Sequence, residues 1–127
     1  MTTKKTIATD RAPAAIGPYS QAVAAGGLLF TSGQLPIDPA TGKIPEGDIE
    51  AHAHIVFRNL DAIAREAGTS LDQAVKTTVF LADIGNFQAV NQVYAQYFKQ
   101  PFPARSAFQV AALPLGAGIE VEAIFQL

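Results

Sequence analysis

The C-terminal part of this 127-residue chain is largely apolar and carries few charged side chains. From Gln100 to the end, the charged residues are Arg105, Glu120 and Glu122. Such groups rarely lie in apolar surroundings unless they are paired or bind a ligand. Arg105 follows a Pro-Ala step at the expected start of a strand, where its forked donors can face a small anion. The sequence therefore supports two interpretations: a structural ion pair between Arg105 and Glu120 or Glu122, or a binding site for an anionic ligand.

The clearest element expected to position these residues is a helix over residues 48–67. Its apolar residues recur at alternating steps of four and three and so share one helical stripe, which consists of Ile49, Ala53, Val56, Leu60, Ile63 and Ala67. Asp48 is a candidate N-cap and Gly68 a candidate C-terminal stop. A second helix is expected over residues 87–99, with Asn86 as its cap. One face of it carries Phe87, Val90, Tyr94 and Tyr97.

The remaining patterned segments predict strands. They lie near residues 4–9, 28–33, 75–82, 106–113 and 118–126, and residues 17–23 form a turn that leads into a further extended piece. The order βββαβαββ predicts an α+β domain with a mixed sheet of about six strands and two helices on one face. The other face would display Phe80 and Ile124, on the far side from Val79 and Phe125. Because no helix remains to cover that face, we expect a homo-oligomer to bury it.

The composition indicates a single domain over residues 1–127 that has a sizeable buried interface. Hydrophobic residues make up 49% of the chain and charged residues 16%, where about a quarter is usual. The net charge of −2 and the scattered basic residues argue against nucleic acid as a partner. The chain has no cysteine, and it shows no pattern of a membrane span or signal peptide. We therefore expect a cytoplasmic protein without a membrane partner.

Other residues that could do chemistry have simpler interpretations. His52 and His54 lie two positions apart on the first helix, so they point in different directions and cannot share a metal. We expect both to be solvated. Tyr94 and Tyr97 have helical spacing and are expected in the core or in an interface. The segment at residues 34–47 is rich in Pro and Gly, and its length predicts a loop that is either disordered or functional.

Five short motifs follow one another along the chain. They are Gly17-Pro18-Tyr19, Thr31-Ser32-Gly33-Gln34, Val90-Asn91-Gln92-Val93-Tyr94, Phe102-Pro103-Ala104-Arg105-Ser106 and Ile119-Glu120-Val121-Glu122-Ala123. In this order they resemble the reactive-intermediate deaminase (Rid/YjgF) family, and the resemblance extends from about Lys5 to Ile124. Residues 5–9, 12–19 and 76–80 are also similar to the family.

The resemblance implies a homotrimer of subunits with a chorismate-mutase-like fold and ligand sites in the clefts between subunits. It also implies hydrolysis of small 2-imino acids, such as 2-iminobutanoate and 2-iminopropanoate, to 2-keto acids and ammonia. These imines and their enamine tautomers escape from pyridoxal-phosphate dehydratases and can damage other enzymes. The resemblance implies no cofactor and no metal.

The resemblance also suggests roles for individual residues. Arg105 would hold the substrate carboxylate through a two-pronged contact, and Glu120 would position or activate the attacking water. The backbone carbonyl of Ala107 would accept a hydrogen bond from the imine nitrogen. The pocket would be shaped by Tyr19, Ser32, Gly33, Phe87 and Asn91. An iminium carbon is already electrophilic, so the site needs an anchor, a water and a dry wall rather than a strong nucleophile.

Some alternatives remain open. Glu122 shares a strand face with Glu120, and only the resemblance favours Glu120. Many family members have Cys where this chain has Ala107, a change that is tolerated if the position acts through its carbonyl. The chain could instead bind or sense 2-keto acids without turnover. It could also be an endoribonuclease or translation inhibitor, as some members are described, although the acidic pI and the lack of a basic stripe argue against an RNA substrate.

Overall fold

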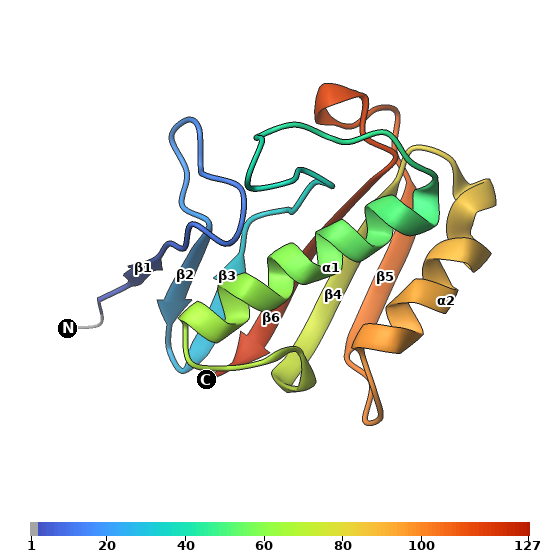
Figure 1. The fold of residues 1–127 in the computed structure, drawn as a ribbon. Helices are drawn as coiled ribbons and strands as arrows, with labels where there is room; N and C mark the ends of the chain where they lie inside the picture. The colour runs from blue at the N-terminus through green and yellow to red at the C-terminus, as the bar shows by residue number, and fades with distance from the viewer. Residues whose placement is uncertain (1–2) are drawn as a thin grey trace.

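The computed structural model describes residues 3–127. It contains a six-stranded mixed sheet, in the order β1-β2-β3-β6-β4-β5, with both helices on one face (Figure 1). The strands are β1 (Lys5–Ile7), β2 (Ala22–Ala25), β3 (Leu28–Thr31), β4 (Ala74–Leu81), β5 (Ala104–Gln109) and β6 (Ile119–Gln126), and the helices are α1 (Ile49–Glu66) and α2 (Phe87–Tyr97). β4 and β5 are parallel and joined through α2, whereas the other neighbouring strands are antiparallel. The predicted fold is confirmed.

Helix α1 forms where the sequence predicts it. The Asp48 side chain accepts a hydrogen bond of 2.8 Å from the Ala51 N–H and so caps the first turn. Gly68 follows the last residues of the helix with a φ of +85°, a conformation that glycine adopts at little cost. The apolar stripe is buried against the sheet, with Val56, Leu60 and Ile63 fully inaccessible.

Three predicted details at the other elements are wrong. Asn86 makes no capping hydrogen bond, because it closes a short 3-10 turn with φ −85° and ψ 1° rather than taking the extended backbone of an N-cap. Helix α2 ends at Tyr97, because the backbone of Phe98 is already extended. Strand β5 begins at Ala104 and ends at Gln109, because its pairing with β4 runs only over these residues.

The sheet has one packed face and one open face. Val79 on β4 and Phe125 on β6 point towards the helices and are 1% and 0% exposed. Phe80 and Ile124 point to the opposite face, as predicted, and are only partly buried. Phe30 pairs with Ile124 on that same face and is 42% exposed. Burial of this face by further copies of the chain stays a prediction.

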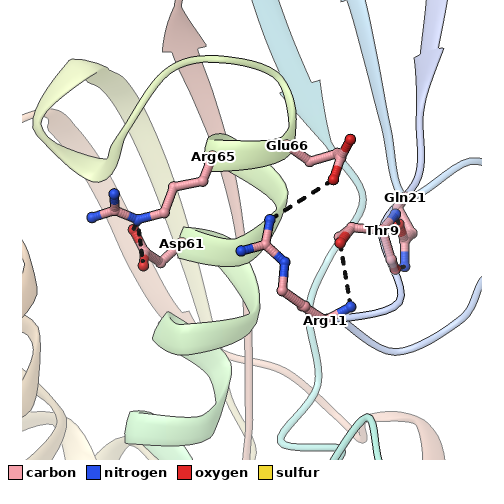
Figure 2. A network of polar contacts seen from close by, with 6 residues as sticks. All are labelled: Thr9, Arg11, Gln21, Asp61, Arg65 and Glu66. Atoms are coloured by element: carbon pink, nitrogen blue, oxygen red, sulfur yellow. Dashed lines mark hydrogen bonds and ion pairs between the residues drawn. The ribbon is translucent and has the colours of Figure 1, made fainter.

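The segment that leads to the Gly17-Pro18-Tyr19 motif is tied down at several points. The buried Gln21 side chain accepts a 2.7 Å hydrogen bond from the Thr9 N–H, and its amide lies within 3.3 Å of three backbone carbonyls in the same segment. Arg11 reaches across to Glu66 at the end of α1, at 3.8 Å, while Arg65 pairs with Asp61 elsewhere on that helix (Figure 2). The N-terminal segment is therefore anchored to both the sheet and α1.

Neither helix has the length and apolar character needed to cross a bilayer, as judged over the residues that the structure describes.

Candidate functional site

Arg105 lies on the edge strand β5, on the face of the sheet that carries the helices. It is in register with the buried Thr77 of β4, and α2 runs alongside. Its Nη1 donates a hydrogen bond of 2.7 Å to the Asn91 Oδ1. The guanidinium carbon is 5.3 Å from the centroid of the Phe87 ring and 4.8 Å from that of Tyr94, both within the range of cation–π attraction. One neutral amide and two aromatic rings therefore hold this cation.

A cavity of about 420 Å³ opens beside the guanidinium. It is lined by Asn91, Tyr94, Ala95, Phe102, Pro103 and Arg105. A guanidinium has five N–H donors, and Asn91 takes one of them. The remaining donors can take a carboxylate in two parallel contacts, next to the apolar side chains that line the cavity.

The ion-pair interpretation of Arg105 is wrong for the single chain. Within residues 3–127 the ion pairs are Arg11 with Glu66 and Arg65 with Asp61. Glu120 and Glu122 point to the open face, as the alternating burial of β6 shows. Arg105 points to the helix face, and β4 lies between its strand and β6. Arg105 and the two glutamates are therefore separated by the sheet itself.

Glu120 is the more enclosed of the two glutamates. Burial raises its pKa, and the neighbouring Glu122 carboxylate raises the pKa further. The loop after β3 passes directly over Glu120, and a Cβ added at Gly33 would come within 2.8 Å of the carboxyl carbon. Glycine at position 33 thus leaves room for the Glu120 carboxylate. The open face presents a partly desolvated acid whose pKa is shifted towards neutrality, as suits proton transfer.

Ser32 connects the loop over Glu120 to the turn that carries Tyr19. The Ser32 hydroxyl donates a 2.6 Å hydrogen bond to the carbonyl of Ser20, the residue after Tyr19. Tyr19 follows a turn at Gly17, whose φ is +125°, and its side chain is 52% exposed. The turn therefore presents the Tyr19 ring to solvent rather than to the core.

Ala107 lies on the same face of β5 as Arg105 and is half-buried. The Val110 N–H donates to the Leu81 carbonyl on β4. Because the direction of backbone groups alternates along a strand, the carbonyl of Ala107 points away from β4 to the free edge. It is therefore available as an acceptor, as the resemblance implies.

The structure thus divides the eight predicted site residues into two groups. The β5–α2 group contains Phe87, Asn91, Arg105 and Ala107, and the loop–β6 group contains Tyr19, Ser32, Gly33 and Glu120. The sequence analysis missed Tyr94, which it assigned to core or interface, although the residue also lines the cavity. Tyr94 lies three positions after Asn91 and seven after Phe87, so their shared helix face was a usable signal.

The two histidines have structural partners and are not simply solvated as expected. The His52 Nε2 lies 2.7 Å from the Pro45 carbonyl, and the His54 Nδ1 lies 2.8 Å from the Tyr97 hydroxyl. Over residues 3–127 no group of three His, Cys, Asp or Glu side chains could hold a metal ion.

Comparison with known proteins identifies the family to which this chain belongs. The model of the family described as Endoribonuclease L-PSP matches residues 9–126. The chain belongs to the Rid family. A human 2-iminobutanoate/2-iminopropanoate deaminase is 48% identical over 121 residues, which cover 95% of this chain and 88% of the human protein.

Solved structures of similar proteins share the whole fold. YyfA from Yersinia pestis, a protein of unknown function in the conserved Rid family, is 50% identical and superposes with a TM-score of 0.96 over 98% of this chain and 100% of that one. Escherichia coli TdcF, solved with bound serine, is 43% identical and has a TM-score of 0.91, covering 97% and 98% of the two chains.

Proposed function

We propose that this protein hydrolyses small 2-imino acids to 2-keto acids and ammonia. The observation that carries the proposal is the Arg105 guanidinium, which is held by Asn91 and two aromatic rings and still has donors free towards a cavity. Such a fork selects a small carboxylate. The name of the human deaminase supports the reaction, and the serine bound to TdcF is a small molecule with the same α-carboxylate.

The chemistry needs only water and a proton carrier. The substrate reacts as the iminium, with its nitrogen protonated. Glu120 takes a proton from water as the oxygen attacks the carbon of the C=N bond, and the electron pair of that bond moves to nitrogen, which becomes a neutral amine. The resulting carbinolamine has both a hydroxyl and an amine on one carbon. Glu120 returns this proton to the amine, and the C–N bond then breaks and releases ammonia. As the C=O bond forms, the Glu120 carboxylate takes the proton of the hydroxyl, which leaves the keto group. The raised pKa of Glu120 makes its carboxylate a stronger base for taking the proton from water.

We further propose that each site forms between two copies in a homotrimer. Arg105 and Glu120 lie on opposite faces of the sheet in one chain, so a site that uses both must take them from different copies. The partly apolar open face with Phe30, Phe80 and Ile124 supports burial against another copy. The expected source of substrate is a pyridoxal-phosphate dehydratase, and the expected setting is the cytoplasm.

A coupled assay tests the proposal directly. A dehydratase generates the imine in the presence of semicarbazide, and hydrolysis by this protein lowers the semicarbazone signal. We expect the wild-type chain to lower it and the Glu120→Gln variant not to. An unchanged signal with the wild-type chain contradicts the proposal. If calorimetry then still detects 2-oxobutanoate binding, the protein is a binder without turnover.

A further inference from the structure

Tyr94 occupies the junction between helix α2, strand β4 and the Arg105 side chain. It is 6% exposed, and its hydroxyl lies 2.8 Å from the hydroxyl of Thr77. Thr77 is fully buried and is the in-register neighbour of Arg105 across β4 and β5. The centroid of the Tyr94 ring is 4.8 Å from the Arg105 Cζ. A buried hydrogen bond, together with packing against Phe57 and Phe98, therefore holds the ring that supports the guanidinium.

Arg105 depends on such support because of where it lies. β5 is an edge strand whose side chains are mostly exposed, so the sheet itself restrains little of the arginine. An arginine side chain has high rotamer entropy, which it loses when its head group is fixed. The head group is contacted by Asn91 and by the rings of Phe87 and Tyr94, all from α2. Through Thr77, Tyr94 also links this contact to the sheet.

We propose that Thr77 and Tyr94 are positioning residues for Arg105. The hydroxyl of Thr77 holds that of Tyr94, so the ring stays against the guanidinium and the donors not used by Asn91 face the cavity. The role in substrate binding rests on the proposed function, whereas the effect on Arg105 does not. Burial raises the pKa of Tyr94, so its hydroxyl stays protonated and remains available for the bond with Thr77.

Matched variants isolate this hydrogen bond. Tyr94→Phe and Thr77→Val each remove one hydroxyl and keep most of the side-chain volume, while Thr77→Ser keeps the hydroxyl. Tyr97→Phe is the control, because it lies on the same helix and loses a bond of the same 2.8 Å length, to His54. The melting temperature of each variant shows whether it remains folded.

The first measurement is independent of activity. Relaxation of ¹⁵N at the Nε–Hε group of Arg105 reports how firmly the side chain is held. We expect greater mobility in Tyr94→Phe and Thr77→Val, and wild-type mobility in Thr77→Ser and Tyr97→Phe. Unchanged Arg105 mobility in the first two variants overturns the proposal. Equal loosening in Tyr97→Phe also overturns it, because the effect would then come from α2 as a whole.

The second measurement uses 2-oxobutanoate as the binding probe. We expect Tyr94→Phe and Thr77→Val to raise its Kd by about three- to tenfold, the scale of one lost hydrogen bond. The KM for the imine should rise with it, and kcat should change less. The double variant should have a Kd no higher than that of the single variant with the higher Kd, because both substitutions break the same hydrogen bond. If the wild-type chain does not hydrolyse 2-imino acids, the proposed function is refuted. The Arg105 mobility measurement still tests the present inference in that case.

Discussion

Arg105 is open to solvent, and yet its head group is held on several sides. The partner that accepts its hydrogen bond is the neutral amide of Asn91, and the rings of Phe87 and Tyr94 are also uncharged. These contacts restrain the guanidinium without cancelling its charge. A carboxylate in place of Asn91 would have satisfied the cation within the chain. An incoming anion therefore meets a full positive charge that is already oriented.

The substitution Arg105→Lys tests whether the fork matters more than the charge. Lysine keeps the charge but loses the planar pair of donors, so the substrate carboxylate can rotate away from the attacking water. A charge-assisted hydrogen bond contributes about 1.5–3 kcal/mol, so we expect kcat/KM to fall by about ten- to hundredfold. The melting temperature should not change. Arg58→Lys, at an exposed position on α1, is the control and should be fully active. A fully active Arg105→Lys enzyme would remove Arg105 from the site.

Glu122 offers a test of Glu120 through pH. The negative charge of Glu122 helps to raise the pKa of Glu120, after the larger effect of burial. Glu122→Gln removes that charge and should lower the pKa of Glu120. If the Glu120 carboxylate is the base, activity falls as pH drops through that pKa, so the acidic limb of the kcat/KM profile should move to lower pH. Glu50→Gln on α1 should leave the limb in place. A limb that stays, or that moves to higher pH, contradicts this assignment.

At the level of elements, the periodic spacing of apolar residues predicted the helices and strands that have one buried face. The helical stripe of α1 and the alternation of β4 and β6 arise because one face of each must be apolar. Phe80 and Ile124 were placed on the open face for the same reason. The bounds of β5 could not be predicted in this way, because an edge strand with exposed side chains carries no clear alternation. Asn86 does not cap α2, because it is the last residue of a 3-10 turn and so lacks the extended backbone of an N-cap.

The sequence could indicate candidate residues for the site, and their role stays a prediction, but it could not indicate how the fold arranges them. The family resemblance indicated eight positions, but only the sheet order reveals that they form two groups on different sides of one chain. Tyr94 was assigned to packing because an aromatic residue at helical spacing usually serves the core. It does pack there, and its ring also lines the Arg105 cavity. Such a double role depends on a tertiary neighbour, which helical spacing does not specify.

The contact between the loop after β3 and strand β6 can be tested at Gly33. A side chain there would collide with the Glu120 carboxylate, so in Gly33→Ala the carboxylate must move. Because small displacements of a reacting group are costly, we expect kcat to fall by about tenfold or more while the protein stays folded. Gly118→Ala is the control, since its Cβ meets only the movable end of Ile49, at 3.2 Å. Wild-type activity in Gly33→Ala would show that Glu120 can act from another position.

For the whole molecule, the two groups predict complementation between inactive chains. Arg105→Ala damages the β5–α2 group, and Glu120→Gln damages the loop–β6 group. If each site takes one group from each of two neighbouring copies, unfolding and refolding an equal mixture creates some sites with both groups intact. Random assembly of a closed ring would give about one quarter of wild-type activity. Each variant refolded alone is the control and should stay inactive. A mixture without activity would mean that one chain supplies both groups.

The separation of the two groups also bears on how such chains diversify. If each site forms between two copies, as proposed, then duplication of the gene followed by joint assembly of both products gives junctions between unlike chains. Each such junction combines the arginine side of one chain with the glutamate side of the other. Two parental proteins then yield sites of four pairings, two of them hybrid, before either sequence has changed at its reactive residues. Selectivity can vary with the ratio in which the two chains are expressed, and selection can act on that ratio as well as on substitutions.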